Sequence, residues 1–238
     1  MHGVITLVHQ RSDIVRLFAM HMEDLGLPWL ACVTEDDYEG QAICERYATD
    51  FTVAPNRPLG GKWNAVMDLA RLHGWETVMV LGSDDLVLPW WVDSCFHDKI
   101  PNGVFLPSSF IARDVRSGQQ LYVERMQTKM IQPLGMAGMV LDGMAVDLAE
   151  WPEQGHSGMD TSMLRGLKEN GVDIDDTILF TLPCLIDLKG PGNIWSYETF
   201  ERWRDKGRGI HRRVTTLHGL PEGLSGRVTD RLLSLVKE

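Results

Sequence analysis

The chain has 238 residues, of which 44% are hydrophobic, and a formal net charge of −10 at pH 7. This length and composition suit one globular domain with a sizeable apolar core. The acidic balance argues against a protein whose whole surface binds nucleic acid, because phosphate binding requires basic side chains. No apolar run approaches the roughly 18 residues of a membrane span, and the N-terminus does not resemble a signal peptide. We therefore expect a soluble, cytoplasmic protein without a membrane segment.

The four cysteines, Cys32, Cys44, Cys95 and Cys184, are widely spaced along the chain. They form no CxxC pair and no cluster with histidine, which argues against a zinc site and against a disulfide framework. We expect all four to be buried free thiols.

The first part of the chain alternates apolar strands with amphipathic helices. The predicted strands cover residues 3–8, 28–33, 51–53 and 77–81. The helices between them begin near Ser12, near residue 40 and at Lys62, and His21 lies on the apolar face of the first as a core residue. Such alternation predicts an α/β fold with a mostly parallel sheet and helices on both faces. Because ligands bind beyond the carboxyl ends of such strands, we expect residues 9–11, 35–37 and 83–85 to meet at one edge.

The pattern changes after Pro89. A predicted helix near 90–97 is followed by extended segments at 104–106, 109–112 and 120–124, by a strand within 135–141, by a helix at 159–170 and by a strand at 178–182. Residues 183–195 look irregular, and helices near 197–206 and 224–237 close the chain. We therefore expect one α/β domain over residues 1–196, with a nucleotide-binding half (1–100) and an acceptor half (101–196). A helical C-terminal tail covers 197–238.

Two adjacent carboxylates, Asp84 and Asp85, follow the strand at 77–81. Carboxylate oxygens at the carboxyl end of a central strand are typical ligands of Mg²⁺ or Mn²⁺, which in turn neutralises the phosphates of a nucleotide. The structural alternative is a solvated turn, in which Ser and Asp are also favoured.

Several other nucleotide-site or hydrolase motifs are absent from the sequence. Gly61-Lys62 is followed by Trp63, so it is not a P-loop, and no GxGxxG turn follows the first strand. No GxSxG elbow is present either. Kinase, dinucleotide-dehydrogenase and α/β-hydrolase functions are therefore not indicated.

The order of the remaining motifs resembles that of GT-A fold glycosyltransferases, in particular the family 2 enzymes that use nucleotide-diphosphate sugars. Residues 80–89 (VLGSDDLVLP) are similar to the aspartate motif of the family, and residues 56–64 are similar to the glycine-rich approach to the preceding helix. Residues 135–141 resemble the acceptor-side strand, and residues 158–160 lie where the family places an acidic base. The resemblance covers about residues 3–187. It departs from the family at Gly82, which replaces the first aspartate of the D-x-D motif.

The resemblance implies a Rossmann-like sheet and transfer of a hexose from a nucleotide sugar, such as a UDP-sugar, to an acceptor hydroxyl. In an inverting transfer a carboxylate must accept the hydroxyl proton, and Asp160 is the candidate, although it also suits a helix N-terminus. A cation on Asp84 and Asp85, Mn²⁺ or Mg²⁺, would stabilise the leaving diphosphate.

Other expected site residues surround the donor. Asp36 or Asp37 would contact the uracil or ribose, and Gln10 and Arg11 would line the same pocket; the alternative for either segment is a solvated loop. Lys62 and Lys189 would add positive charge at the diphosphate. Residues 187–195 form a Gly/Pro-rich segment that is either a lid over the donor or a surface loop.

The acceptor and the competing functions stay open. A soluble glycan, a small molecule, a protein or a hydroxymethylated DNA base would suit a compact enzyme. The net charge disfavours DNA, but residues 201–213 contain six basic and two acidic side chains. The alternatives are a non-catalytic nucleotide- or glycan-binding module, favoured by Gly82, and a sugar nucleotidyltransferase. The second alternative usually needs a glycine-rich loop after the first strand, which residues 9–12 do not form.

Overall fold

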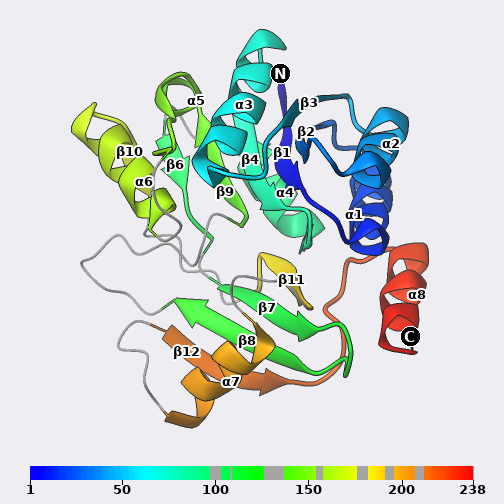
Figure 1. Ribbon diagram of the computed structural model, residues 1–238. Coiled ribbons are helices and arrows are strands. Elements are labelled where there is room, and N and C mark those ends of the chain that lie inside the picture. The colour runs from blue at the N-terminus through cyan, green and yellow to red at the C-terminus, as the bar shows by residue number, and fades with distance from the viewer. Residues whose placement is uncertain are drawn as a thin grey trace.

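The structure is a computed structural model that describes residues 1–96, 103–107, 109–125, 137–153, 158–175, 182–190, 196–206 and 212–237. Two β-sheets, each covered by helices, lie one beside the other (Figure 1). The chain enters the larger sheet first and reaches the smaller one through the turn at Ser83 and Asp84.

The larger sheet has the strand order β10-β6-β9-β4-β1-β2-β3. Its strands are β1 (His2–Val8), β2 (Trp29–Thr34), β3 (Asp50–Ala54), β4 (Thr77–Gly82), β6 (Gly103–Phe105), β9 (Met139–Asp142) and β10 (Asp173–Asp175). Neighbouring strands are parallel except that β9 runs antiparallel to β4 and to β6. The predicted mostly parallel sheet is therefore confirmed.

Helices cover both faces of this sheet, as the sequence predicts (Figure 1). They are α1 (Ser12–Leu25), α2 (Tyr38–Tyr47), α3 (Leu59–Leu72), α4 (Pro89–Phe96), α5 (Met144–Leu148) and α6 (Met159–Glu169). Because successive side chains of a strand point to opposite faces, Val4 of β1 packs with Phe18 of α1, whereas Ile5 packs with Met67 of α3. Two apolar layers of this kind hold the strand ends in fixed positions.

The smaller sheet has the order β12-β8-β7-β11-β5. Its strands are β5 (Asp85–Val87), β7 (Ser109–Asp114), β8 (Gln120–Arg125), β11 (Leu185–Lys189) and β12 (Arg212–Leu217). Helix α7 (Tyr197–Lys206) packs against this sheet through Phe200. The rings of Phe200 and Phe110 meet edge to face, with their centroids 5.7 Å apart. Helix α8 (Gly226–Ser234), followed by a short 3₁₀ turn (Leu235–Lys237), lies against α1, where Val228 and Leu232 join Leu17.

The structure corrects the sequence-based reading of the last third of the chain. The predicted irregular segment at 183–195 is wrong for Leu185–Lys189, which form β11, and the tail that we expected to be helical also contains β12. Its two helices, α7 and α8, are confirmed. The strand expected at 178–182 and most of the candidate lid fall outside the described residues. The division into a domain and a tail stays a prediction.

Most of the predicted core residues are buried. His21 is 1% exposed and its Nε2 lies 2.6 Å from the Val87 carbonyl oxygen, which joins α1 to β5. All four cysteines are buried and free. Among the described helices, none has the length and apolar character needed to cross a membrane.

A pair of hydrogen bonds links α3 to the chain that follows α5. Asn64 donates through Nδ2 to the Trp151 carbonyl oxygen at 2.9 Å and accepts from the Trp151 N–H at 2.8 Å. We expect Asn64→Ala to lower the free energy of unfolding by about 2–3 kcal/mol, because two backbone groups beside a buried tryptophan lose their partner. Urea unfolding measures this loss.

Asn170→Ala is the matched control, since its amide donates to the Gly166 carbonyl oxygen on an exposed helix end. Its cost should stay below about 0.5 kcal/mol. Equal losses in the two variants would contradict a structural role for Asn64.

Candidate functional site

The candidate site lies where the order of the larger sheet reverses. After β1 the chain passes to β2 and β3 on one side, and it then returns to β4 on the other side of β1. Parallel pairing of β1 with β2 and with β4 brings their carboxyl ends to one edge, as the sequence predicts. Arg11, after β1, and Asp84, after β4, form an ion pair across this point, with Nη1 and Oδ2 3.2 Å apart. Such switch points are the usual ligand sites of doubly wound sheets.

The corner between β1 and α1 has an unusual backbone. Gln10 and Arg11 have φ values of 56° and 54°, in the left-handed region that non-glycine residues seldom adopt. The Gln10 N–H donates to Asp37 Oδ2 at 2.6 Å, and Asp37 Oδ1 caps α2 by accepting from the Gly40 N–H at 2.9 Å. Strain of this kind persists where surrounding contacts enforce it, often at functional sites.

The two acids predicted to contact the nucleotide therefore differ in their surroundings. Asp37 is 8% exposed and both of its oxygens accept backbone N–H groups, so it fixes the Gln10–Arg11 corner. Asp36 is exposed at the same edge. Of the two, Asp36 is the better placed to meet a ligand.

Lys62 lies beneath the strand ends instead of at the surface. It is 1% exposed, and its Nζ donates to the Val8 carbonyl oxygen at 3.1 Å and to Thr34 Oγ1 at 2.8 Å. Burial lowers the pKa of its ammonium group. Lys62 thus joins the ends of β1 and β2, and the phosphate contact expected for it stays a prediction.

Asp85 is turned back into the protein. It is 4% exposed, and its Oδ2 accepts the Gly82 N–H at 2.6 Å. Burial raises the pKa of Asp85 well above its ordinary value, and the nearby carboxylates of Asp187 and Asp84 raise it further. A Cβ at Gly82 would lie 2.6 Å from Asp84 Oδ1 and 2.7 Å from Asp85 Oδ2. The two carboxylates therefore fill the space around Gly82.

The structure adds Asp187 to the site. Antiparallel pairing of β11 with β5 sets Asp187 opposite Asp85, and its Oδ2 forms an ion pair with Lys189. Burial raises the pKa of Asp187 to about 6. Burial alone would lower the pKa of Lys189, but the carboxylates of Asp187 and Asp84 outweigh it, so the pKa is raised.

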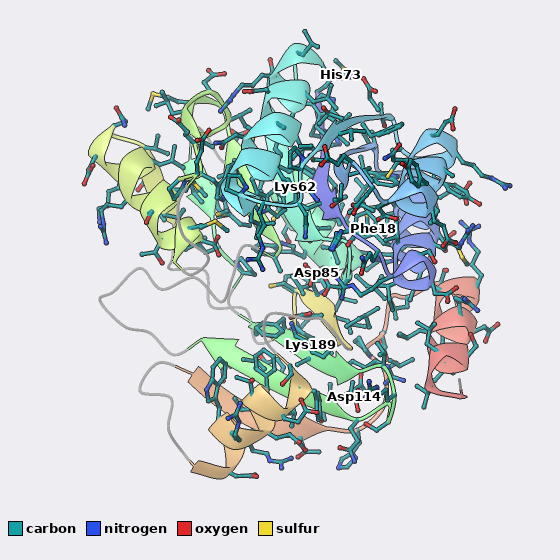
Figure 2. All side chains as sticks on the ribbon, viewed as in Figure 1. Phe18, Lys62, His73, Asp85, Asp114 and Lys189 are labelled. Atoms are coloured by element: carbon teal, nitrogen blue, oxygen red, sulfur yellow. The ribbon has the colours of Figure 1, made fainter. Side chains whose placement is uncertain are left out.

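Five residues thus form one charged cluster: Arg11, Asp84, Asp85, Asp187 and Lys189. Figure 2 shows Asp85 and Lys189 in the region where the two sheets meet, and each is within electrostatic reach of the other. Asp187 could have been found by its alternation with apolar Ile186 and Leu188, which is the pattern of a strand.

The described residues do not fit a divalent cation in this arrangement. Among them, no group of three or more His, Cys, Asp or Glu side chains has the geometry of a metal site. Asp84 pairs with Arg11, and Asp187 pairs with Lys189. Asp85 accepts a backbone N–H. The metal site expected at Asp84 and Asp85 stays a prediction, and we derive no chemical step through a metal.

Asp160 lies on a different element from the residues of the charged cluster. It is in the first turn of α6, after Gly158, whose φ is 77°. Helix α6 packs on β10, and β6 and β9 stand between β10 and β4 in the sheet. Burial raises the pKa of Asp160 to about 6. Asp160 is half-buried, and a carboxyl group with a raised pKa that a substrate can still reach is a suitable proton acceptor.

Comparison with known proteins supports the fold. No family model matches the chain, and no curated protein matches it. A structure of S. aureus TarS, residues 1–349, aligns with a TM-score of 0.53 at 11% identity over 79% of this chain and 60% of the TarS fragment. The chain thus spans less than two thirds of that fragment.

Two further structures align less well. The inositol-1-phosphate CTP transferase of T. maritima has a TM-score of 0.44 at 12% identity, over 100% of this chain and 97% of its own. The glycosyltransferase GlyE of Streptococcus pneumoniae TIGR4 has a TM-score of 0.40 at 12% identity, over 82% of this chain and 57% of its own. Together with the observed strand order, the TarS alignment shows that the chain has the GT-A type of α/β fold.

The raised pKa of Asp160 predicts a pH effect on stability. Because this pKa is higher in the folded than in the unfolded chain, ionisation favours unfolding as the pH rises from about 4 to above about 6. The free energy of unfolding should therefore fall by roughly 1–3 kcal/mol over this pH range, and Asp160→Asn should abolish this fall. Urea unfolding at several pH values measures it.

Glu169→Gln, at the other end of α6, is the control and should keep the slope of the wild type over this pH range. If Asp160→Asn has the same pH slope as the wild type, Asp160 is not the residue that carries the raised pKa.

Proposed function

We propose that the protein is a glycosyltransferase that moves a sugar from a nucleoside-diphosphate sugar to an acceptor hydroxyl. The observation that carries the proposal is the Arg11–Asp84 ion pair at the switch point of a GT-A type sheet. It places a guanidinium group, the side chain best suited to phosphate oxygens, where such sheets bind their ligands.

The donor nucleotide would lie over the carboxyl ends of β1 and β2. Asp36 is exposed at this edge and is suited to accept hydrogen bonds from the ribose or the base. His9 supports the assignment, because its Nδ1 is buried without a hydrogen-bond partner in the described structure. Buried polar atoms normally have a partner, and a bound nucleotide would supply one.

The transfer needs a proton acceptor on the side of the acceptor. The hydroxyl oxygen forms a bond to the anomeric carbon, the bond from that carbon to the diphosphate breaks, and the hydroxyl proton passes to Asp160. This single displacement inverts the configuration at the anomeric carbon. A carboxyl pKa of about 6 lets Asp160 stay ionised at neutral pH and still be a stronger base than an ordinary carboxylate.

The acceptor is defined only as a hydroxyl-bearing molecule, a glycan, a small molecule or a hydroxymethylated base. The basic segment at 201–213 does not decide between them. Two of its arginines on α7 already have protein partners: Arg204 pairs with Asp205, and Arg202 bonds to Thr199.

The test is turnover of UDP-, GDP-, CDP- and TDP-sugars, with release of the nucleoside diphosphate as the signal. We expect Asp160→Asn to slow release by at least about 100-fold, because general base catalysis contributes that much. The affinity for the nucleoside diphosphate should be unchanged. In the wild type, the rate should rise with pH through about 6 and level off above it.

Glu169→Gln should retain the wild-type rate and pH profile. A fully active Asp160→Asn would exclude Asp160 as the base. Release of pyrophosphate from a nucleoside triphosphate and a sugar phosphate would instead indicate a nucleotidyltransferase. Binding of a nucleotide sugar without any turnover would indicate a binding module.

A further inference from the structure

We propose that this site binds the diphosphate of its donor without a divalent cation, with Arg11 and Lys189 supplying the positive charge. The inference rests on the proposed function, because it concerns the same donor site. It is carried by the partners, the burial and the spacing of the charged cluster.

The carboxylates that would hold a cation are already engaged by protein groups. Asp84 Oδ2 lies 3.2 Å from Arg11 Nη1, and Asp187 Oδ2 forms an ion pair with Lys189. Asp85 is 4% exposed and binds the Gly82 N–H. A hydrated Mg²⁺ or Mn²⁺ ion would have to displace the Arg11 guanidinium and the Lys189 ammonium group from these oxygens, and both groups would repel it.

Gly82 removes the remaining ligand position. A side chain there would begin 2.6 Å from Asp84 Oδ1 and 2.7 Å from Asp85 Oδ2. Those distances are too short for the two aspartates to keep their present positions. The glycine and the inward orientation of the carboxylates therefore belong together, and position 82 offers no carboxylate where a D-x-D motif has its first aspartate.

The two positively charged side chains, Arg11 and Lys189, have different roles. The Arg11 side chain is 30% exposed at the switch point, and its guanidinium has several N–H donors, so it can contact phosphate oxygens directly. Lys189 is 7% exposed, and its charge acts on Asp187, Asp84 and Asp85. Lys189 is thus a positioning residue that neutralises the carboxylates beneath the diphosphate, so that they do not repel it.

The first test is calorimetric titration with UDP, GDP, CDP and TDP in EDTA and in Mn²⁺ or Mg²⁺. We expect at least one nucleoside diphosphate to bind with affinities that agree within about twofold in all three conditions. Arg11→Gln should weaken this binding about tenfold or more in EDTA, whereas Arg16→Gln, which removes an exposed ion pair with Glu39, should not.

Lys189→Met tests the second cation, and folding of the variant is checked by its unfolding transition. The uncompensated carboxylates should make nucleoside diphosphate binding dependent on Mn²⁺, with a gain of about tenfold or more over EDTA. A merely structural role for Lys189 would not create such a dependence.

Binding by the wild type that occurs only with Mn²⁺ or Mg²⁺ would overturn the inference and leave the proposed function standing. An Arg11→Gln variant with unchanged affinity in EDTA would also overturn it. If no nucleoside diphosphate binds in any condition, both the inference and the proposed function fail.

Discussion

The structure depends on the burial of several charges where the two sheets meet. Strand β4 of the larger sheet passes through Ser83 and Asp84 directly into β5 of the smaller one, so the carboxylates of Asp84 and Asp85 stand at the junction. A charge in such a place is costly unless a partner of opposite sign or a hydrogen-bond donor lies beside it. Strand β11 provides that partner, because its pairing with β5 brings Lys189 into reach of the carboxylates. The pairing of this charged cluster thus joins the two sheets, together with the apolar core that both sheets share.

The surroundings of the cluster explain how the site keeps its shape before a ligand arrives. Asp37 holds the left-handed backbone at Gln10 and Arg11, and Lys62 ties the end of β1 to that of β2. Both residues can therefore maintain the geometry of the site without contacting a substrate, since each holds a neighbouring strand end in place. The cost of ordering the site is then met during folding, which leaves more of the interaction energy for ligand binding.

Local patterns predicted the first part of the fold correctly. Strands β1 to β4 and the helices between them follow from apolar periodicity and helix caps, and the edge that contains Arg11, Asp36 and Asp84 follows from parallel pairing. Strand β11 was missed because its alternating pattern extends over only five residues, and its burial comes from pairing with β5 about a hundred residues earlier. The ion pairs of Asp84 and Asp187 could not be predicted for a similar reason. Their partners come from elements distant in sequence from Asp84: Arg11 lies just before α1, and Lys189 lies on β11.

Gly82, Arg11 and Lys189 form a physically consistent set. A D-x-D motif concentrates negative charge and requires a mobile cation to neutralise it, whereas here one carboxylate is absent and two fixed cations face those that remain. Partly buried side chains such as Arg11 and Lys189 would have less bound water to lose on contact with a diphosphate than a hydrated Mg²⁺ ion has. Their geometry is also set by the fold, because Arg11 sits on a strained corner held by Asp37. In the function proposed above, such a site would stabilise the leaving diphosphate by preorganised charge, and the size of the effect would depend on how well the two sheets hold Arg11 and Lys189 in place.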